Sequence, residues 1–198
     1  VIVVEATGIQ DIASGPLLRI SDDRFVAGLT ELVEAVRTAS NGETKLFIQL
    51  IDFLNIRRRP EPSRYFNQFL RITDEHRAAL GQPGMSDDAT REALAGATKE
   101  QLRECLSPRE LEALHYGHRE RVTDTHLPHI RNLPSRLPSL FADAAQRAQD
   151  AGFNGIELHY AHAYTMASFL SRRNTREDGY GTTPDGRARA PLEVFREI

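Results

Sequence analysis

Three side chains that can handle protons lie close together in the C-terminal part of the chain. His159, His162 and Tyr164 follow directly after a short apolar run, Gly155-Ile156-Glu157-Leu158. Two imidazoles and a phenol at the end of a strand can hold a carbonyl oxygen and deliver a proton to a neighbouring atom. The residue types and their spacing therefore predict a site for polar chemistry at this strand end.

Three apolar segments are predicted to be strands, and each gives way to polar residues at its end. They are Val1–Glu5, Lys45–Gln49 and Gly155–His159. Continuous apolar runs of this length are typical of parallel strands buried on both faces. In a (β/α) barrel the C-terminal strand ends share one face, which carries the active site. We therefore expect these ends to converge, although solvated loops alone also explain polar strand ends.

Amphipathic helices separate the predicted strands. The first is expected to begin at Ser21 or Asp22 and to stop at Asn41-Gly42, and a later one is expected to begin at Ser139 and to end at Gly152. Strand, helix, strand is the βαβ unit of parallel sheets. Short units in series indicate an α/β fold that is either a barrel or a doubly wound sheet.

A long insertion, residues 53–138, lies between the second and third predicted strands. Its pattern is mostly helical, since the segments starting at Thr98 and Ser107 each open with a capping box, and the second is expected to be helical over residues 108–121. A helical insertion after the C-terminal end of a strand is a candidate lid or specificity element in a barrel enzyme.

Composition excludes several classes of protein. The 198 residues are 40% hydrophobic and 27% charged, which is ordinary for one core, and the formal charge of -3 argues against a nucleic-acid partner. No apolar run has the length of a membrane span. Cys105 is the single cysteine, so neither a disulfide nor an all-cysteine metal site can form within this chain. We expect a cytoplasmic protein that acts on a small-molecule substrate. Assembly into a homo-oligomer is one possibility for its oligomeric state.

The segment from Ala151 to Arg189 closely resembles the Old Yellow Enzyme family of NADH:flavin oxidoreductases. The family pattern reads H-x-x-(H/N)-x-Y, then F-L, then N-x-R-x-D-x-Y-G and an Arg-rich helix start. The matching positions here are His159, His162, Tyr164, Phe169-Leu170, Asn174, Arg176, Asp178, Tyr180-Gly181 and Arg187. So many fixed positions in one segment argue against a chance match.

The resemblance implies an FMN-binding TIM barrel with NADH or NADPH as reductant. It implies that Tyr164 is the catalytic proton donor, and that His159 and His162 hold the oxygen of an electron-poor alkene. It also implies that Gln49 and Ala6 contact FMN, at the pyrimidine edge and against the ring, with His159 between cofactor and substrate. The following motif residues, Asp178, Tyr180 and Arg187, are expected to be structural.

The chain departs from the family pattern in places. Ile51-Asp52-Phe53 stands where a His-x-Gly-Arg signature often follows the Gln-Leu pair, and Tyr160 takes the place of a small residue beside the histidines. These changes predict a divergent subgroup and leave the substrate undetermined. The His/His/Tyr set is intact.

Histidine pairs with i, i+3 spacing raise the alternative of a metal-dependent barrel hydrolase. The pairs are His115/His118, His126/His129 and His159/His162. No HExxH motif and no acidic residue at a convincing ligand spacing accompanies them, so surface or capping histidines explain the first two pairs better. We therefore predict no metal site.

Both ends of the chain look cut, because it opens directly on a strand pattern and stops within an amphipathic helix pattern. We interpret residues 1–198 as a single incomplete domain: about strands two to four of a (β/α)8 TIM barrel with their helices, and the long insertion after the third strand. The expected activity of the parent protein is FMN-dependent reduction of an activated alkene by NAD(P)H, with the fragment alone inactive. A non-catalytic fragment or decayed homologue is the remaining alternative.

Overall fold

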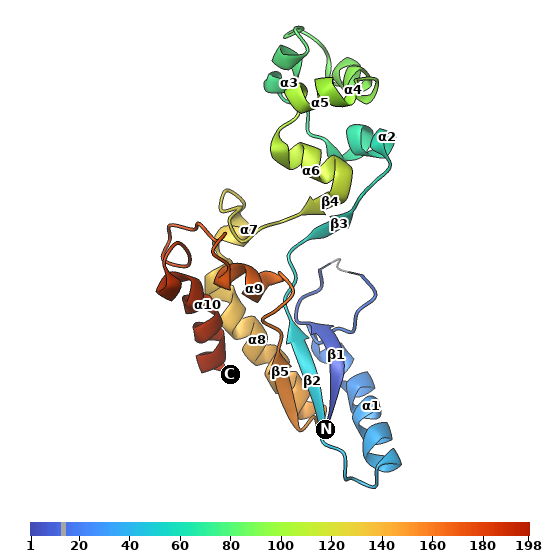
Figure 1. Ribbon diagram of the computed structural model, residues 1–198. Helices are drawn as coiled ribbons and strands as arrows, with labels where there is room; N and C mark the ends of the chain where they lie inside the picture. The colour runs from blue at the N-terminus through green and yellow to red at the C-terminus, as the bar shows by residue number, and fades with distance from the viewer. Residues whose placement is uncertain (13–14) are drawn as a thin grey trace. The chain divides into compact units, whose positions relative to one another are not determined.

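The computed structural model describes residues 1–12 and 15–198, which fall into two units (Figure 1). The first, here called the sheet unit, combines Val1–Asn55 with Glu120–Ile198. The second, here called the insertion unit, is Ile56–Arg119. The insertion predicted over residues 53–138 therefore extends past this unit at both ends.

The sheet unit is built on a parallel sheet. Its strands are β1 (Ile2–Gly8), β2 (Leu46–Ile51) and β5 (Gly155–Leu158), in the spatial order β1-β2-β5. All three predicted strands are present, and β1 and β2 continue past their predicted ends. The α/β class with a parallel sheet is thus confirmed, whereas the partial barrel remains a prediction.

Helices cover one face of this sheet (Figure 1). Alternate residues of β2, namely Leu46, Ile48 and Leu50, are buried in the core. The helices that supply the opposing side chains are α1 (Val26–Ala39) and α8 (Leu133–Asp150), with α10 (Pro184–Glu197) packed against α8. Burial of a Leu or Ile side chain stabilises a fold by about 1.5–3 kcal/mol, so this layer stabilises the packing of the sheet against its helices.

The start of α1 agrees with one of its two predicted caps. Asp22 accepts a hydrogen bond from the Arg24 amide at 3.0 Å and caps a 3-10 turn, η1 (Asp23–Phe25), which leads into α1. A carboxylate at this position satisfies an amide that the helix itself leaves without a partner.

The start of α8 was predicted wrongly. The helix begins at Leu133 rather than after Ser139, and it runs through Pro138. A proline so near the N-terminus removes one backbone hydrogen bond only, while Leu133, Leu137 and Phe141 form a buried stripe at i, i+4 spacing. Packing of this stripe outweighs the lost bond.

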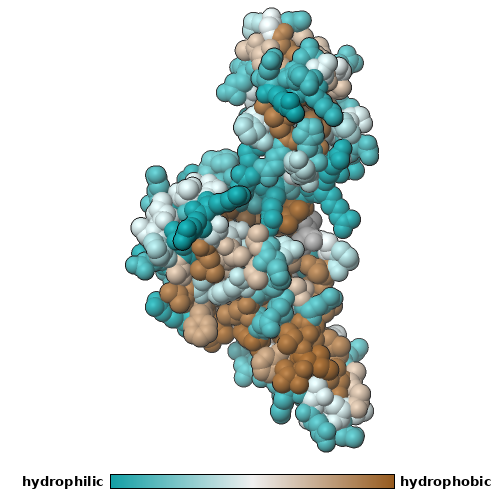
Figure 2. All heavy atoms as spheres, viewed as in Figure 1, coloured by the Kyte–Doolittle hydropathy of each residue, from teal (hydrophilic) through white to brown (hydrophobic). Residues whose placement is uncertain are grey.

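The N-terminal half of the sheet exposes apolar side chains (Figure 2). Val1, Ile2 and Val3 are 85%, 51% and 41% exposed. The sheet is open, with β1 and β5 at its edges. An apolar sheet edge in water favours association with further polypeptide.

The insertion unit is a small helical body on a two-stranded ribbon, β3 (Ile56–Arg58) paired antiparallel with β4 (Gly117–Arg119). Its helices are α2 (Pro62–Arg64), the π-helical turn η2 (Tyr65–Phe69), α3 (Asp74–Ala79), α4 (Asp87–Ala95), α5 (Lys99–Cys105) and α6 (Pro108–Tyr116). The capping boxes predicted at Thr98 and Ser107 are confirmed.

The helix predicted over residues 108–121 ends earlier, at Tyr116. Gly117 adopts a φ of 98° and opens β4, where a side chain would place its Cβ 2.5 Å from the Arg57 carbonyl oxygen. Only glycine fits this close approach of two backbones. Pairing with β3 thus overrides the helical pattern.

Of the helices in residues 1–12 and 15–198, none is long and apolar enough to cross a membrane.

Candidate functional site

The structure brings three predicted cofactor-contact residues together at the C-terminal ends of the strands. This end of the sheet is here called its C-terminal edge. Ala6 lies near the end of β1, Gln49 lies in β2, and the His159 amide donates to the Leu50 carbonyl oxygen at 3.0 Å. Because β1, β2 and β5 are parallel neighbours, their C-terminal ends share this edge. The predicted convergence of the strand ends is therefore present.

His159 and His162 are in direct contact. The Nε2 atom of His159 lies 3.1 Å from Nδ1 of His162, so a single proton joins the two rings. The His159 side chain is buried, and burial lowers its pKa below the usual range for histidine. His159 is therefore neutral at physiological pH. Its Nδ1 is buried too, and has no hydrogen-bond partner in the part of the chain that the structure describes.

Tyr164 completes the cluster at the start of the next helix, α9 (Thr165–Leu170), where it is the N-cap residue. Its ring meets the His159 ring edge-on, with centroids 5.6 Å apart, and the Phe53 ring in the same way at 5.0 Å. Edge-to-face contacts of this kind fix the plane of an aromatic ring. The phenol is thus held beside the imidazoles by packing on two sides.

The loop between β5 and α9 has an unusual backbone. His162 and Ala163 have φ values of 55° and 57°, in the left-handed region that non-glycine residues rarely adopt. Two such residues in succession turn the chain back at once, which is how His162 returns to His159 within three positions. The Ser168 hydroxyl donates to the Ala163 carbonyl oxygen at 3.0 Å and helps to hold this turn.

Gln49 lies beside an acidic side chain on the neighbouring strand. Glu157 is its register partner on β5, and the Gln49 amide donates a hydrogen bond to the Glu157 carboxylate. This contact orients the amide of Gln49 at the edge of the sheet. An oriented amide can offer a donor and an acceptor to adjacent heteroatoms of a ligand.

Asp52 is a buried acid at this edge that the sequence analysis did not single out. It directly follows β2, is 1% exposed, and accepts a hydrogen bond from Gln10 at 2.6 Å. The signal was present in the sequence, since an acid between Ile51 and Phe53 interrupts an apolar run. The sequence pattern alone marks that segment only as a departure from the family signature.

The later motif residues act within the fold. The Arg176 guanidinium is buried; it donates to the carbonyl oxygens of Val122, Ile130 and Arg131 and forms an ion pair with Asp178. In the same segment the Tyr180 hydroxyl bonds to the Glu193 carboxylate, and Arg187 donates to the Thr182 carbonyl oxygen. These contacts connect the loop after α9 with α10 and with the segment before α8.

The other histidine pairs have partners of a different kind. The His129 Nε2 atom lies 2.9 Å from a Glu120 carboxylate oxygen, His126 is exposed, and the His115 ring lies against Tyr116. Among residues 1–12 and 15–198, no three His, Cys, Asp or Glu side chains gather as they would around a metal ion. The metal-hydrolase alternative therefore has no ligand set in this part of the chain.

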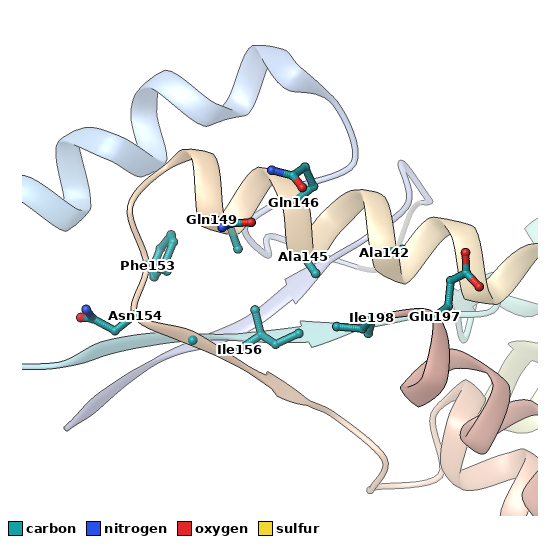
Figure 3. A pocket seen from close by; sticks show the side chains of 11 residues that line it. Ala142, Ala145, Gln146, Gln149, Phe153, Asn154, Ile156, Glu197 and Ile198 are labelled. Atoms are coloured by element: carbon teal, nitrogen blue, oxygen red, sulfur yellow. The ribbon is translucent and has the colours of Figure 1, made fainter.

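A cavity of about 470 Å³ lies away from this edge (Figure 3). It is bordered by α8, the start of β5 and the last residues of the chain, including Ala145, Gln149, Phe153, Ile156 and Ile198. Its position at the N-terminal end of β5 separates it from His159. The cavity is therefore not part of the candidate site.

The chain is similar to known proteins in both sequence and fold. A profile of the NADH:flavin oxidoreductase / NADH oxidase family matches residues 136–198. The chain is 30% identical over 182 residues to an NADH oxidase of Thermoanaerobacter brockii, and 33% identical over 145 residues to an NADPH dehydrogenase of Bacillus licheniformis. The structure of morphinone reductase in complex with tetrahydroNAD resembles this fold with a TM-score of 0.56 and 25% identity.

These similarities cover most of the chain but a minor part of each relative. The matches span 91% and 64% of this chain, and 21% and 42% of the two enzymes. For morphinone reductase the figures are 98% and 46%. The profile match, the similar enzymes and the structural likeness all point to flavin-linked oxidoreductases. Residues 136–198 thus match the NADH:flavin oxidoreductase / NADH oxidase family, and the chain as a whole is similar to parts of such flavin-linked enzymes.

Proposed function

We propose that the protein is an FMN-dependent NAD(P)H oxidoreductase that reduces the carbon–carbon double bond of an activated alkene, such as an enone. The observation that carries the proposal is the cluster of His159, His162 and Tyr164 at the C-terminal edge of a parallel sheet. The names of the relatives, NADH oxidase and NADPH dehydrogenase, support a nicotinamide reductant.

The residues at this edge fit a flavin. Gln49 presents an amide oriented by Glu157, and the buried Nδ1 of His159 is a polar atom without a hydrogen-bond partner among the described residues. The pyrimidine edge of a flavin alternates donors and acceptors, which an amide and an imidazole can meet. Ala6 is small and half-buried at the end of β1, where its backbone can approach a flat ring. We assign these three residues to FMN binding.

In the proposed reaction the two imidazoles bind the substrate oxygen. FMN, when bound, supplies the hydride that NADH or NADPH has delivered to it. As the β-carbon accepts this hydride, negative charge moves onto the oxygen, and N–H donors from His159 and His162 stabilise the charge where it develops. The neutral state of His159 suits this role, since a neutral imidazole donates without giving up its proton.

Tyr164 is the proposed general acid. Its ring is packed against His159 and Phe53, so the phenol is held next to the group that binds the oxygen. A proton delivered to the α-carbon completes the reduction of the double bond. Substitution of the acid should therefore affect the alkene step alone.

A visible absorption spectrum of the purified full-length protein tests the assignment. We expect bound FMN that bleaches on addition of NADH or NADPH and recovers when 2-cyclohexenone is added under anaerobic conditions. A colourless protein that does not bind added FMN would contradict the proposal. Flavin that is reduced by NAD(P)H but is reoxidised by oxygen and not by the enone would limit the function to an oxidase.

A further inference from the structure

Asp52 is a buried acid in the sheet unit that has no role in the proposed reaction. Its side chain is 1% exposed at the end of β2. One carboxylate oxygen, Oδ1, accepts a hydrogen bond of 2.6 Å from the Gln10 amide, which lies in the segment after β1. The other, Oδ2, is buried with no hydrogen-bond partner in the chain as described. Burial of a carboxyl group is costly and therefore calls for an explanation.

The backbone of the same residue supports the loop that carries Tyr164. The Thr165 hydroxyl, itself buried, donates to the Asp52 carbonyl oxygen at 3.1 Å. Thr165 directly follows Tyr164, and Phe53, which directly follows Asp52, packs its ring against the Tyr164 ring at 5.0 Å. The Asp52-Phe53 pair thus contacts the Tyr164-Thr165 pair twice, once through a hydrogen bond and once through a ring contact.

We propose that Asp52 is a positioning residue for Tyr164, and that it joins the segments after β1, β2 and β5 into one support for the site. The inference rests on the proposed function, in which Tyr164 is the proton donor. It also adds to that function, because it predicts that the geometry of the proton donor depends on the charge of a residue that touches neither substrate nor cofactor.

The charge of Asp52 is set to change within the working range of an enzyme. Burial raises the pKa of its carboxyl group from 3.8 to about 6, although the Thr165 hydroxyl, the Gln10 amide and the charge of Arg136 on α8 each act to lower it. Above this pKa the ionised group accepts a charge-assisted hydrogen bond from Gln10. Below it the carboxylic acid is a weaker acceptor, and the connection to the segment after β1 loosens.

The first test follows both half-reactions by stopped-flow absorbance in the full-length FMN-loaded protein between pH 5 and 8. We expect reoxidation of the reduced flavin by 2-cyclohexenone to slow about fivefold below a midpoint near pH 6, as loss of one charge-assisted hydrogen bond predicts. Asp52→Asn should remove this step while leaving flavin reduction by NAD(P)H unchanged. The matched control is Asp11→Asn, an exposed acid beside Gln10, which should keep the step.

A second variant tests the same idea without changing the acid. Gln10→Ala removes one donor that lowers the Asp52 pKa, so the midpoint of the Asp52 titration should move to higher pH. The kinetic step should disappear, because the hydrogen bond on which it depends is absent. An NMR titration of side-chain carboxyl carbons reports the same shift with or without flavin, so it also tests the inference if the proposed function fails. Survival of the pH step in Asp52→Asn, equal slowing of both half-reactions, or an unmoved midpoint in Gln10→Ala would each overturn the inference.

Discussion

At the scale of single residues, the candidate site depends on the protonation and the hydrogen bonding of two histidines. His159 is neutral because burial lowers its pKa, and its Nε2 is engaged with Nδ1 of His162 at 3.1 Å. A substrate oxygen that receives a hydrogen bond from both rings must take the place of this contact. In the proposed function, the contact between the histidines holds both rings at the site in the absence of a substrate oxygen.

Loss of either donor should weaken the alkene step. We predict that His159→Ala and His162→Ala each lower kcat/KM for 2-cyclohexenone by about 100-fold, the usual effect of removing one donor to a developing oxyanion. His126→Ala, which alters an exposed histidine, is the control and should leave the value unchanged. Steady-state kinetics with saturating NAD(P)H measure the effect. An unchanged kcat/KM in both variants would remove the histidines from substrate binding.

Asp52 should make stability depend on pH in a direction opposite to that of most acids. Its pKa is raised from 3.8 to about 6, so the ionised group destabilises the folded state. This penalty is fully present above the folded-state pKa and disappears as the pH falls from there towards the unfolded value, because the folded protein binds the proton first.

Asp52→Asn should therefore raise the free energy of unfolding at pH 7.5 by up to roughly 3 kcal/mol, with a much smaller gain at pH 4.5. Urea unfolding at the two pH values measures the difference. The same variant is expected to slow alkene reduction at pH 7.5. A gain in stability together with a loss of activity would separate a positioning residue from one that only supports the fold. An equal change in stability at both pH values would show that the charge of Asp52 is not the cause.

At the scale of elements, sequence patterns predicted what local physical chemistry controls. The three parallel strands, the cap at Asp22 and the two capping boxes depend on alternation, apolar runs and short polar spacings, and all are present. The errors arose where distant residues decide. Residues 117–119 join a ribbon with residues 56–58, and the buried stripe of α8 continues the helix through Pro138.

In the candidate site, too, the features set by local sequence could be predicted, and those set by distant residues could not. The arrangement of His159, Gln49 and Ala6 at one edge could be predicted, since parallel strand ends converge wherever such a sheet forms. The left-handed turn at His162 and the role of Asp52 could not be predicted. The turn depends on the backbone conformation of two non-glycine residues. The role of Asp52 depends on a hydrogen bond that its carboxyl group accepts from Gln10, which is distant in the sequence.

The ribbon of the insertion unit offers a direct test of one such distant contact. Gly117→Ala should destabilise this unit by about 1–3 kcal/mol, because the new Cβ would lie 2.5 Å from the Arg57 carbonyl oxygen at a φ that favours glycine. Gly84→Ala is the matched control, since a Cβ there meets nothing within 4 Å. Hydrogen exchange of the amides of residues 56–58 and 117–119 measures the effect. Equal protection in the two variants would contradict the close approach.

At the scale of the whole molecule, the chain carries the proposed site at the C-terminal ends of the strands of a three-stranded sheet. It spans 21% of the NADH oxidase and 42% of the NADPH dehydrogenase to which it is similar. The residues proposed for proton transfer and for binding of the substrate oxygen nevertheless all lie within residues 159–164. The central claim can therefore be tested by one substitution in the full-length protein.

The most direct test is Tyr164→Phe, followed through both half-reactions by anaerobic stopped-flow absorbance. The variant keeps the ring that packs on Phe53 and His159 and removes only the hydroxyl group. Our account predicts that reoxidation of the reduced flavin by 2-cyclohexenone slows by about 100-fold or more, while flavin reduction by NAD(P)H is unchanged. Equal slowing of the two half-reactions, or no slowing of either, would contradict the assignment of Tyr164 as the proton donor.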